Sequence, residues 1–173
     1  LHASGDPDAS DDKGQGFDAI LDAPLFGGSR LSFWTTQAFD LVGTNSSSGI
    51  LHATVHTNIT IRNGTVRGWV TGVQLSGTVD SSVSDLCAAR NAVEGIRCGK
   101  GARIRDCQAS RNGTGMIVGD ASLVDNSVTV SNTFDMGISA GNGCKISGCI
   151  ARDNGNSGDI VVRLKARDHR VRE

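Results

Sequence analysis

The chain has 173 residues, a formal net charge of −1 and only 4% aromatic residues, while 23 of its residues are glycine. A glycine-rich, aromatic-poor composition is typical of short strands joined by tight turns. The near-neutral charge gives no indication of a nucleic-acid partner, and no apolar run approaches the roughly 18 residues that span a bilayer. We therefore expect an all-β domain with neither a nucleic-acid partner nor a membrane partner.

Residues 1–16 are predicted to form a flexible acidic leader, because they hold four aspartates and almost no apolar side chains that could be buried. A calcium loop is the alternative, but the segment lacks the glycine and terminal glutamate of an EF-hand pattern. Its first residues show neither the basic nor the apolar region of a signal peptide. Residues 17–38 are apolar and are predicted to cap the N-terminal end of a repeat structure, whose first coil would otherwise expose its core.

Residues 39–162 contain a repeat with a period near 20 residues, which predicts a parallel β-helix, a solenoid of about six coils. His52 and His56 lie in its first part, and their alternation places both rings on one side of a strand. Without a third ligand nearby, two exposed or stacked histidines are favoured over a metal site. Residues 163–173 form a basic C-terminal tail, and solvation is the favoured interpretation.

Two columns recur along the repeats, the first in five of them and the second in four. The first is a column of small residues that is predicted to point into the core: Gly64, Cys87, Cys107, Ser127 and Cys149. Stacked thiols are favoured there over a Cys87–Cys107 disulfide, because the side chains of stacked coils are parallel. Zinc is disfavoured, since there is no C-x-x-C pair, and we expect no metal. The second column is Asn91, Asn112, Asn132 and Asn154, predicted to form an asparagine ladder at a left-handed turn.

Strand alternation predicts which side chains point inward. Four rows of small aliphatic residues fit a narrow stacked core. They are Ile61, Ile104, Val124 and Ile146; Val66, Ala89, Ala109, Thr129 and Ala151; Val73, Ile96, Met116 and Ile138; and Leu75, Cys98, Val118 and Ala140.

The outward rows are where a functional site is expected. One row alternates in charge, as Arg62, Asp85, Arg105, Asp125 and Ser147, and is interpreted as a stack of salt bridges. Arginine and aspartate are also the residues of sugar-cleaving enzymes, so Arg105, Asp85, Asp106 and Asp125 are the catalytic candidates. Ligand-binding candidates are Arg62, Arg97 and Gln74. Outward aliphatic residues mark a predicted partner surface, namely Ile117, Val128, Val130 and Ile150. The second outward row is predicted to be Thr65, Ala88, Gln108, Val128 and Ile150, and the third Gln74, Arg97, Ile117 and Ser139.

The repeats NITIRNGTVRGWVTGVQLSG and KGARIRDCQASRNGTGMIVG resemble the right-handed parallel β-helix repeats of the pectin-lyase-like superfamily. They are most similar to short bacterial proteins built from an I-x-x-C-x-A-x-x-N-x-x-x-G-I repeat, including the NosD-like group. The resemblance covers residues 39–162 and implies a right-handed coil. It also slightly favours an extracellular or periplasmic location. It does not specify an activity, because the same fold hosts lyases, hydrolases, epimerases, adhesins and phage tailspikes.

The enzyme motifs of that superfamily do not match this chain. The N-T-D and G-H-G motifs of polygalacturonase-like hydrolases are absent, as is the D-P-H motif of epimerase-like members, and Arg103-Ile104-Arg105 is only distantly similar to R-I-K. Pectate lyases bind calcium with an acidic cluster beside an arginine base, so calcium is implied here only for a lyase-like enzyme.

We therefore expect a non-enzymatic β-helix module that binds a polysaccharide or a protein partner, with a homo-oligomer as one form of that partner. A polysaccharide lyase, hydrolase or epimerase acting on acidic glycans is the alternative. A shaft-like subunit of a larger assembly is the third candidate.

Overall fold

The structure is a computed structural model that describes residues 39–45, 47–52 and 55–162. The predicted leader (1–16), cap (17–38) and tail (163–173) lie outside the described residues. Every regular element in the described part is a strand, as the all-β prediction requires. The strands are β1 (Phe39–Val42), β2 (Ser48–Leu51), β3 (Thr60–Arg67), β4 (Thr71–Val79), β5 (Ser82–Ala89), β6 (Glu94–Lys100), β7 (Arg103–Arg105), β8 (Gln108–Ser110), β9 (Thr114–Val118), β10 (Leu123–Asp125), β11 (Val128–Val130), β12 (Met136–Ala140), β13 (Lys145–Ser147), β14 (Ile150–Arg152) and β15 (Gly158–Val162).

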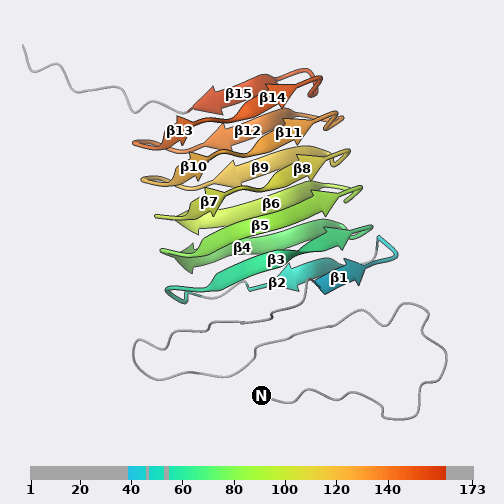
Figure 1. The fold of residues 1–173 in the computed structure, drawn as a ribbon, viewed down its shortest axis with the longest axis horizontal. Coiled ribbons are helices and arrows are strands. Elements are labelled where there is room, and N and C mark those ends of the chain that lie inside the picture. Colours follow the sequence, from blue (N-terminus) through green and yellow to red (C-terminus); the bar gives the residue numbers. More distant parts are fainter. Residues whose placement is uncertain (1–38, 46, 53–54, 163–173) are drawn as a thin grey trace, which may run out of the picture.

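The strands form two parallel sheets that stack coil on coil (Figure 1). The nine-stranded first sheet holds β1, β3 and β5, followed by the short pairs β7 and β8, β10 and β11, and β13 and β14. The second sheet runs β2-β4-β6-β9-β12-β15. Each strand therefore pairs with its counterpart in the next coil, and the described chain is a parallel β-solenoid of about six turns, as the repeat predicts.

Each coil bends at residues with a positive φ angle, and these residues form three columns. The first corner is Asn58, Asp80, Gly101, Ala121 and Gly143; the second is Asn63, Asp85, Asp106, Asn126 and Gly148; the third is Gly68, Arg90, Arg111, Ser131 and Asp153. The three positions follow one another at five-residue intervals in each coil, as in Asp80, Asp85 and Arg90. Glycine, asparagine and aspartate tolerate this left-handed conformation best.

The strand register confirms most of the predicted core and corrects one part of it. Val73, Ile96, Met116 and Ile138 are fully buried in one row, as predicted. In β5, however, Gly64 pairs with Leu86 rather than with Cys87, so the predicted phase is wrong by one residue. The side chain of Leu86 is only 2% exposed, and Cys87 is half-buried on the outer side of the sheet.

The same shift moves the neighbouring alanines. Ala88 is fully buried and aligns with Val66 and Ala109, whereas Ala89, predicted to be inward, lies on the outer side. The prediction aligned cysteine with cysteine, but the backbone sets the phase at the left-handed Asp85, after which the first inward side chain is Leu86. Phe39 occupies the space beside Gly64 that a side chain would fill there.

The asparagine column is hydrogen-bonded from coil to coil, and all of its members except the half-buried Asn154 are buried. Asn91 Nδ2 donates to Asn112 Oδ1 over 3.0 Å, Asn112 Nδ2 to Asn132 Oδ1 over 3.1 Å, and Asn132 Nδ2 to Asn154 Oδ1 over 2.7 Å. The left-handed turn residue is not the asparagine itself, as the sequence suggested, but the residue before it, such as Arg90 or Arg111.

The rings of His52 and His56 are in edge-to-face contact, with centroids 4.3 Å apart. All five cysteines are free thiols, and Cys87 is in register with Gln108 rather than with Cys107. Burial raises the pKa of Cys98 and of Cys107 to about 12, which keeps both in the unreactive thiol form near neutral pH. The described residues contain no helix long and apolar enough to span a membrane.

Candidate functional site

The predicted catalytic residues lie at and beside the second corner. Asp85 and Asp106 occupy consecutive corner positions, while Arg105 and Asp125 are paired neighbours in the adjacent row on β7 and β10. The row that was predicted to alternate in charge is interrupted, because Arg62 and Arg105 both pair with Ser84 rather than with Asp85.

The predicted stack of salt bridges is therefore not formed as expected. Arg105 Nε instead lies 3.1 Å from Asp106 Oδ2, its neighbour in sequence, and Asp125 Oδ1 accepts a hydrogen bond from Ser147 Oγ over 2.8 Å. Asp106 also accepts a hydrogen bond from Asn126. The polar groups of Arg105, Asp106 and Asp125 are thus already engaged with neighbouring side chains at the second corner.

The predicted ligand-binding residues lie on different sheets. Arg62 is in β3 of the first sheet, and Gln74 and Arg97 are in register on β4 and β6 of the second. Arg97 Nη1 lies 2.6 Å from Glu94 Oε1, and Gln74 Oε1 accepts a hydrogen bond from Ser48 Oγ over 2.8 Å. Their polar groups are thus engaged within the second sheet.

The predicted partner surface is divided between the two sheets in the same way. Val128 pairs with Ile150 in the first sheet, with Val130 two residues further along β11, whereas Ile117 belongs to β9 of the second sheet. Cys87, not Ala88, stands in the row that leads to Gln108 and Val128. Ile150 is 55% exposed, so an apolar patch exists on the first sheet, but Ile117 is not part of it.

The third corner differs from the other two in the residues that adopt the left-handed conformation. The first and second corners carry asparagine, aspartate and glycine, with one alanine. The third corner instead has arginine in two consecutive coils, at Arg90 and Arg111. A left-handed conformation costs roughly 1–2 kcal/mol for a residue with a Cβ atom. Ala121 and Ser131 bear the same local cost in their coils, so Arg90 and Arg111 differ from them in charge and length and not in backbone conformation.

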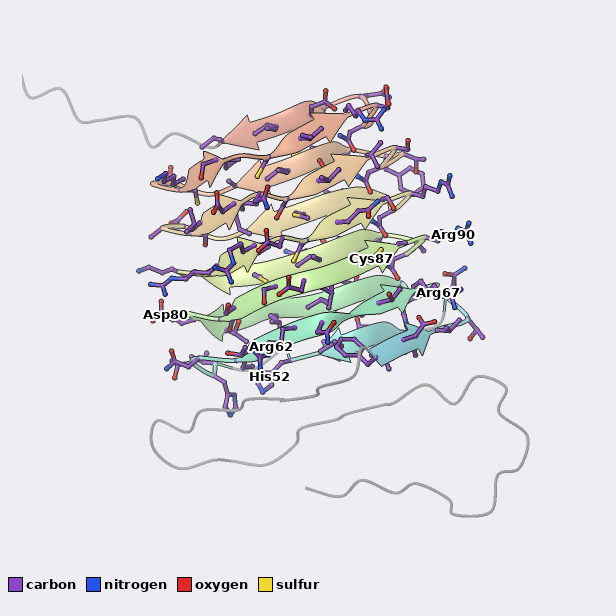
Figure 2. All side chains as sticks on the ribbon, viewed as in Figure 1. His52, Arg62, Arg67, Asp80, Cys87 and Arg90 are labelled. Carbon is purple, nitrogen blue, oxygen red and sulfur yellow. The ribbon has the colours of Figure 1, made fainter. Side chains whose placement is uncertain are left out.

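Two further arginines lie beside this corner. Arg67 and Arg152 belong to the row that ends the first sheet, together with Ala89, Ser110 and Val130. We call Arg67, Arg90, Arg111 and Arg152 the arginine corner. Figure 2 shows Arg67 and Arg90 at the edge of the solenoid opposite Asp80 of the first corner. Arg67, Arg90 and Arg111 come from three successive coils, and Arg152 comes from the second coil after Arg111, so the positive charge runs along the solenoid axis with one coil left out at Ser131.

The two central arginines differ from the outer two in their electrostatic partners. Arg67 binds Asp40 through Nη2 at 2.8 Å and Nε at 3.2 Å, and its hydrogen bonds hold the pKa of Asp40 below the usual value. Arg152 lies 3.5 Å from Asp153. Within the described ranges, neither Arg90 nor Arg111 has a carboxylate at ion-pair distance. The centre of the arginine corner therefore presents two exposed guanidinium groups to solvent.

A shallow groove of about 380 Å³ adjoins Arg111 on the side of the first sheet. Its lining offers the amide of Gln108, the hydroxyls of Ser110 and Ser131, and the half-buried side chain of Val130. Arg152 and Asp153, from the coil after Val130 and Ser131, complete the lining of the groove. Guanidinium, amide and hydroxyl groups around a small apolar floor suit a ligand that is both anionic and rich in hydroxyl groups.

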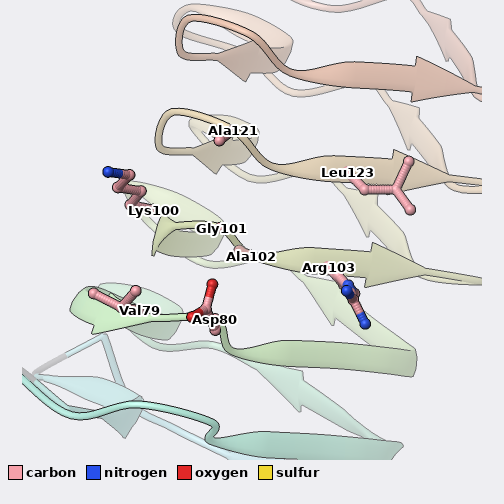
Figure 3. Close-up of a pocket in the computed structure, with 8 residues that line it drawn as sticks. All are labelled: Val79, Asp80, Lys100, Gly101, Ala102, Arg103, Ala121 and Leu123. Atoms are coloured by element: carbon pink, nitrogen blue, oxygen red, sulfur yellow. The ribbon is translucent and has the colours of Figure 1, made fainter.

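A second depression, of about 480 Å³, lies at the first corner (Figure 3). Asp80, Lys100 and Arg103 bring charges of both signs to it, and Val79 and Leu123 add apolar contacts. The Asp80 carboxylate lies over Gly101, where a Cβ atom would collide with it. This depression holds two cations and one carboxylate, the same charge balance as the groove beside Arg111, but its lining lacks the side-chain amide and hydroxyl groups of that groove.

No three histidine, cysteine, aspartate or glutamate side chains in the described part of the chain come together as a metal site. Strand alternation did not predict the arginine corner, because Arg90 and Arg111 lie outside the outward row that was predicted to alternate in charge. The signal of this corner was an arginine directly before the repeated asparagine in two consecutive repeats, at Arg90-Asn91 and Arg111-Asn112.

Fold and site together define the chain as a parallel β-solenoid with an arginine-lined edge. Comparisons of its sequence with protein-family models and with curated proteins, and a search of solved structures, found no match.

Proposed function

We propose that the chain is a non-enzymatic module that binds an acidic polysaccharide along the arginine corner, within a right-handed β-helix of the pectin-lyase-like kind that its repeats resemble. The observation that supports this proposal most directly is the pair Arg90 and Arg111, two exposed arginines at left-handed positions of consecutive coils.

The direction of the charge favours a linear ligand. Consecutive coils of a parallel sheet lie about 4.8 Å apart, so Arg67, Arg90 and Arg111 offer one cation per coil over three consecutive coils. An acidic polysaccharide carries its carboxylate or sulfate groups at regular intervals along an extended chain. Guanidinium groups bind such oxyanions with paired, charge-assisted hydrogen bonds, and Gln108, Ser110 and Ser131 add partners for sugar hydroxyls.

The form of the corner favours binding over catalysis. The turns that lead from the asparagine column to the second sheet are short. The turn between Asn112 and β9 is Gly113 alone, and the turn between Asn132 and β12 is residues 133–135. Short turns leave the guanidinium groups open to water. Electrostatic catalysis of sugar cleavage needs an enclosed site in which charges act at low dielectric.

Replacing either central arginine is expected to weaken binding. Loss of a hydrogen bond to a charged group costs about 1.5–3 kcal/mol, so Arg90→Ala and Arg111→Ala should each lower the affinity roughly tenfold or more. Titration calorimetry against polygalacturonate, alginate and heparin at low salt measures the loss, with neutral dextran as the reference ligand. The affinity should also fall as salt screens the charges.

Arg103→Ala is the matched control, because Arg103 is exposed on the first sheet but lies at the depression of the first corner. The affinity of Arg103→Ala for the acidic glycans should equal that of the unmodified protein. An equal loss in Arg103→Ala would show diffuse attraction, and failure of the unmodified protein to bind any acidic glycan would contradict the proposal.

A second candidate function, an enzyme acting on acidic glycans, is favoured by one observation. Asp85 and Asp106 are stacked at the second corner, and Arg105 is ion-paired with Asp106. If these groups act as acid and base, Arg105→Ala should lower turnover of a uronate polymer at least about a hundredfold. The assay is run with and without calcium. An unmodified protein that gives no cleavage or epimerisation under both conditions excludes this candidate.

A further inference from the structure

One aromatic side chain stands exposed beside the arginine corner. Phe134 is 72% exposed and lies in the three-residue turn 133–135, between Asn132 and β12. The backbone N–H of Phe134 donates to the carbonyl oxygen of Gly113 over 3.0 Å, which joins this turn to the neighbouring coil. Gly113 is the single residue between Asn112 and β9 and follows Arg111 by two positions. The ring of Phe134 thus borders the turn that carries Arg111.

The position of the ring depends on the absence of a side chain at Gly113. A Cβ atom on residue 113 would lie 2.7 Å from Phe134 Cδ2 and 2.5 Å from the carbonyl oxygen of Val93. Gly113 has an ordinary backbone conformation, since it is not among the residues with positive φ. Glycine is therefore required here for the close approach of the ring and not for a special turn.

Val93, which is 48% exposed, lies on the opposite side of Gly113 in the preceding coil. We call these two exposed residues, Phe134 and Val93, the apolar strip, since both border Gly113, which follows Arg111 by two positions. An exposed phenylalanine contributes little to folding, because its ring remains in water. An exposed apolar strip next to binding groups usually marks a contact surface for a ligand or partner.

The strip and the arginines match two different parts of one ligand. A sugar ring has an apolar face of C–H groups, which packs on the electron-rich face of an aromatic ring. An acidic sugar carries its carboxylate or sulfate at the rim of the same ring, within reach of an adjacent guanidinium. An acidic peptide offers the charge without a flat apolar face.

We propose that Phe134 is the sugar-stacking residue of the arginine corner, packing on one sugar ring while Arg111 and Arg90 bind the acidic groups of that ring and its neighbour. This inference rests on the proposed function and assigns a specificity determinant to the same site. Asp135 and Asp153 lie on the C-terminal side of Arg111, and Asp40 holds Arg67. Arg90 and Arg111, which have no ion-paired carboxylate among the described residues, therefore mark the central subsites.

The test compares Phe134→Ala and Phe134→Trp with the unmodified protein. Ligands are an oligogalacturonate, a heparin-derived oligosaccharide of similar length, and polyglutamate as an anionic polymer without sugar rings. In Phe134→Ala the affinity for the more tightly bound of the two oligosaccharides should fall roughly five- to tenfold. The affinity of the same variant for polyglutamate should not change. Phe134→Trp should retain the oligosaccharide affinity, and its tryptophan emission should shift when the oligosaccharide is added.

Two further variants control the interpretation. Val55→Ala removes another exposed apolar side chain, which is outside the arginine corner, and should bind both ligand classes as the unmodified protein does. Gly113→Ala should also weaken oligosaccharide binding, because the new methyl group meets both the ring of Phe134 and the backbone carbonyl oxygen of Val93. Circular dichroism of each variant confirms that the solenoid remains folded.

The outcomes separate this inference from the proposed function. Oligosaccharide binding that falls in Arg90→Ala and Arg111→Ala but not in Phe134→Ala overturns the stacking role alone. An equal loss for oligosaccharide and polyglutamate in Phe134→Ala also overturns it. Absence of acidic glycan binding in the unmodified protein overturns both.

Discussion

Replacing Asn112 with alanine is expected to destabilise the solenoid by about 3 kcal/mol or more. The Oδ1 atom of Asn112 accepts hydrogen bonds from the backbone N–H and the Nδ2 group of Asn91, both over 3.0 Å. Its Nδ2 group donates to the carbonyl oxygen of Ala88 over 3.1 Å. The substitution leaves these buried groups without partners, and each such group costs about 1–3 kcal/mol.

Urea unfolding followed by circular dichroism measures this loss. Asn156→Ala is the matched control, because Asn156 is an exposed asparagine in the turn before β15 and should change the free energy of unfolding by less than about 0.5 kcal/mol. Similar losses in the two variants would show that the asparagine column contributes no special stability.

Replacing Leu86 with alanine is expected to lower the free energy of unfolding by a similarly large amount. Leu86 is almost fully buried in the core, and removal of a buried leucine side chain typically costs about 2–5 kcal/mol. Cys87 is half-buried on the outer side of the same strand, so Cys87→Ala should cost less than about 1 kcal/mol. The free energy of unfolding of both variants is compared under the same conditions.

This pair of variants also tests the strand register. If Cys87 lay in one inward column with the other cysteines, as the spacing of the repeats predicted, Cys87→Ala would lower the free energy of unfolding more than Leu86→Ala. Leu86→Ala would then be nearly neutral. The reverse order is expected from the pairing of Gly64 with Leu86.

The fold class could be predicted because the repeat is carried by many residues at once. Rows such as Val73, Ile96 and Met116 keep both their spacing and their apolar character, so alternation assigned them correctly. The phase of β5 could not be predicted as well, because Leu86 and Cys87 both suit a core position. A slip of one residue exchanges the two faces of a strand. The left-handed residue that sets the phase is Asp85, and aspartate does not signal such a turn as clearly as glycine does.

The candidate site was less predictable, for a reason of geometry. Alternation separates inward from outward side chains but does not state which sheet an outward residue belongs to. For that reason Ile117 was grouped with Val128, although they lie on different sheets. Phe134 could not be placed at all, because its exposure depends on a three-residue turn that meets a one-residue turn at Gly113.

The stacking of coils has a consequence for how the chain folds. Equivalent corner residues, such as Asp85, Asp106 and Asn126, are only 20–22 residues apart in every described coil. Closing each new coil onto the stack therefore costs a similar, modest loop entropy, however long the solenoid is. Folding of such a chain can begin at any pair of coils and extend from there by one neighbour at a time. The rate of folding should then depend on the best-formed pair of coils and hardly at all on the total length.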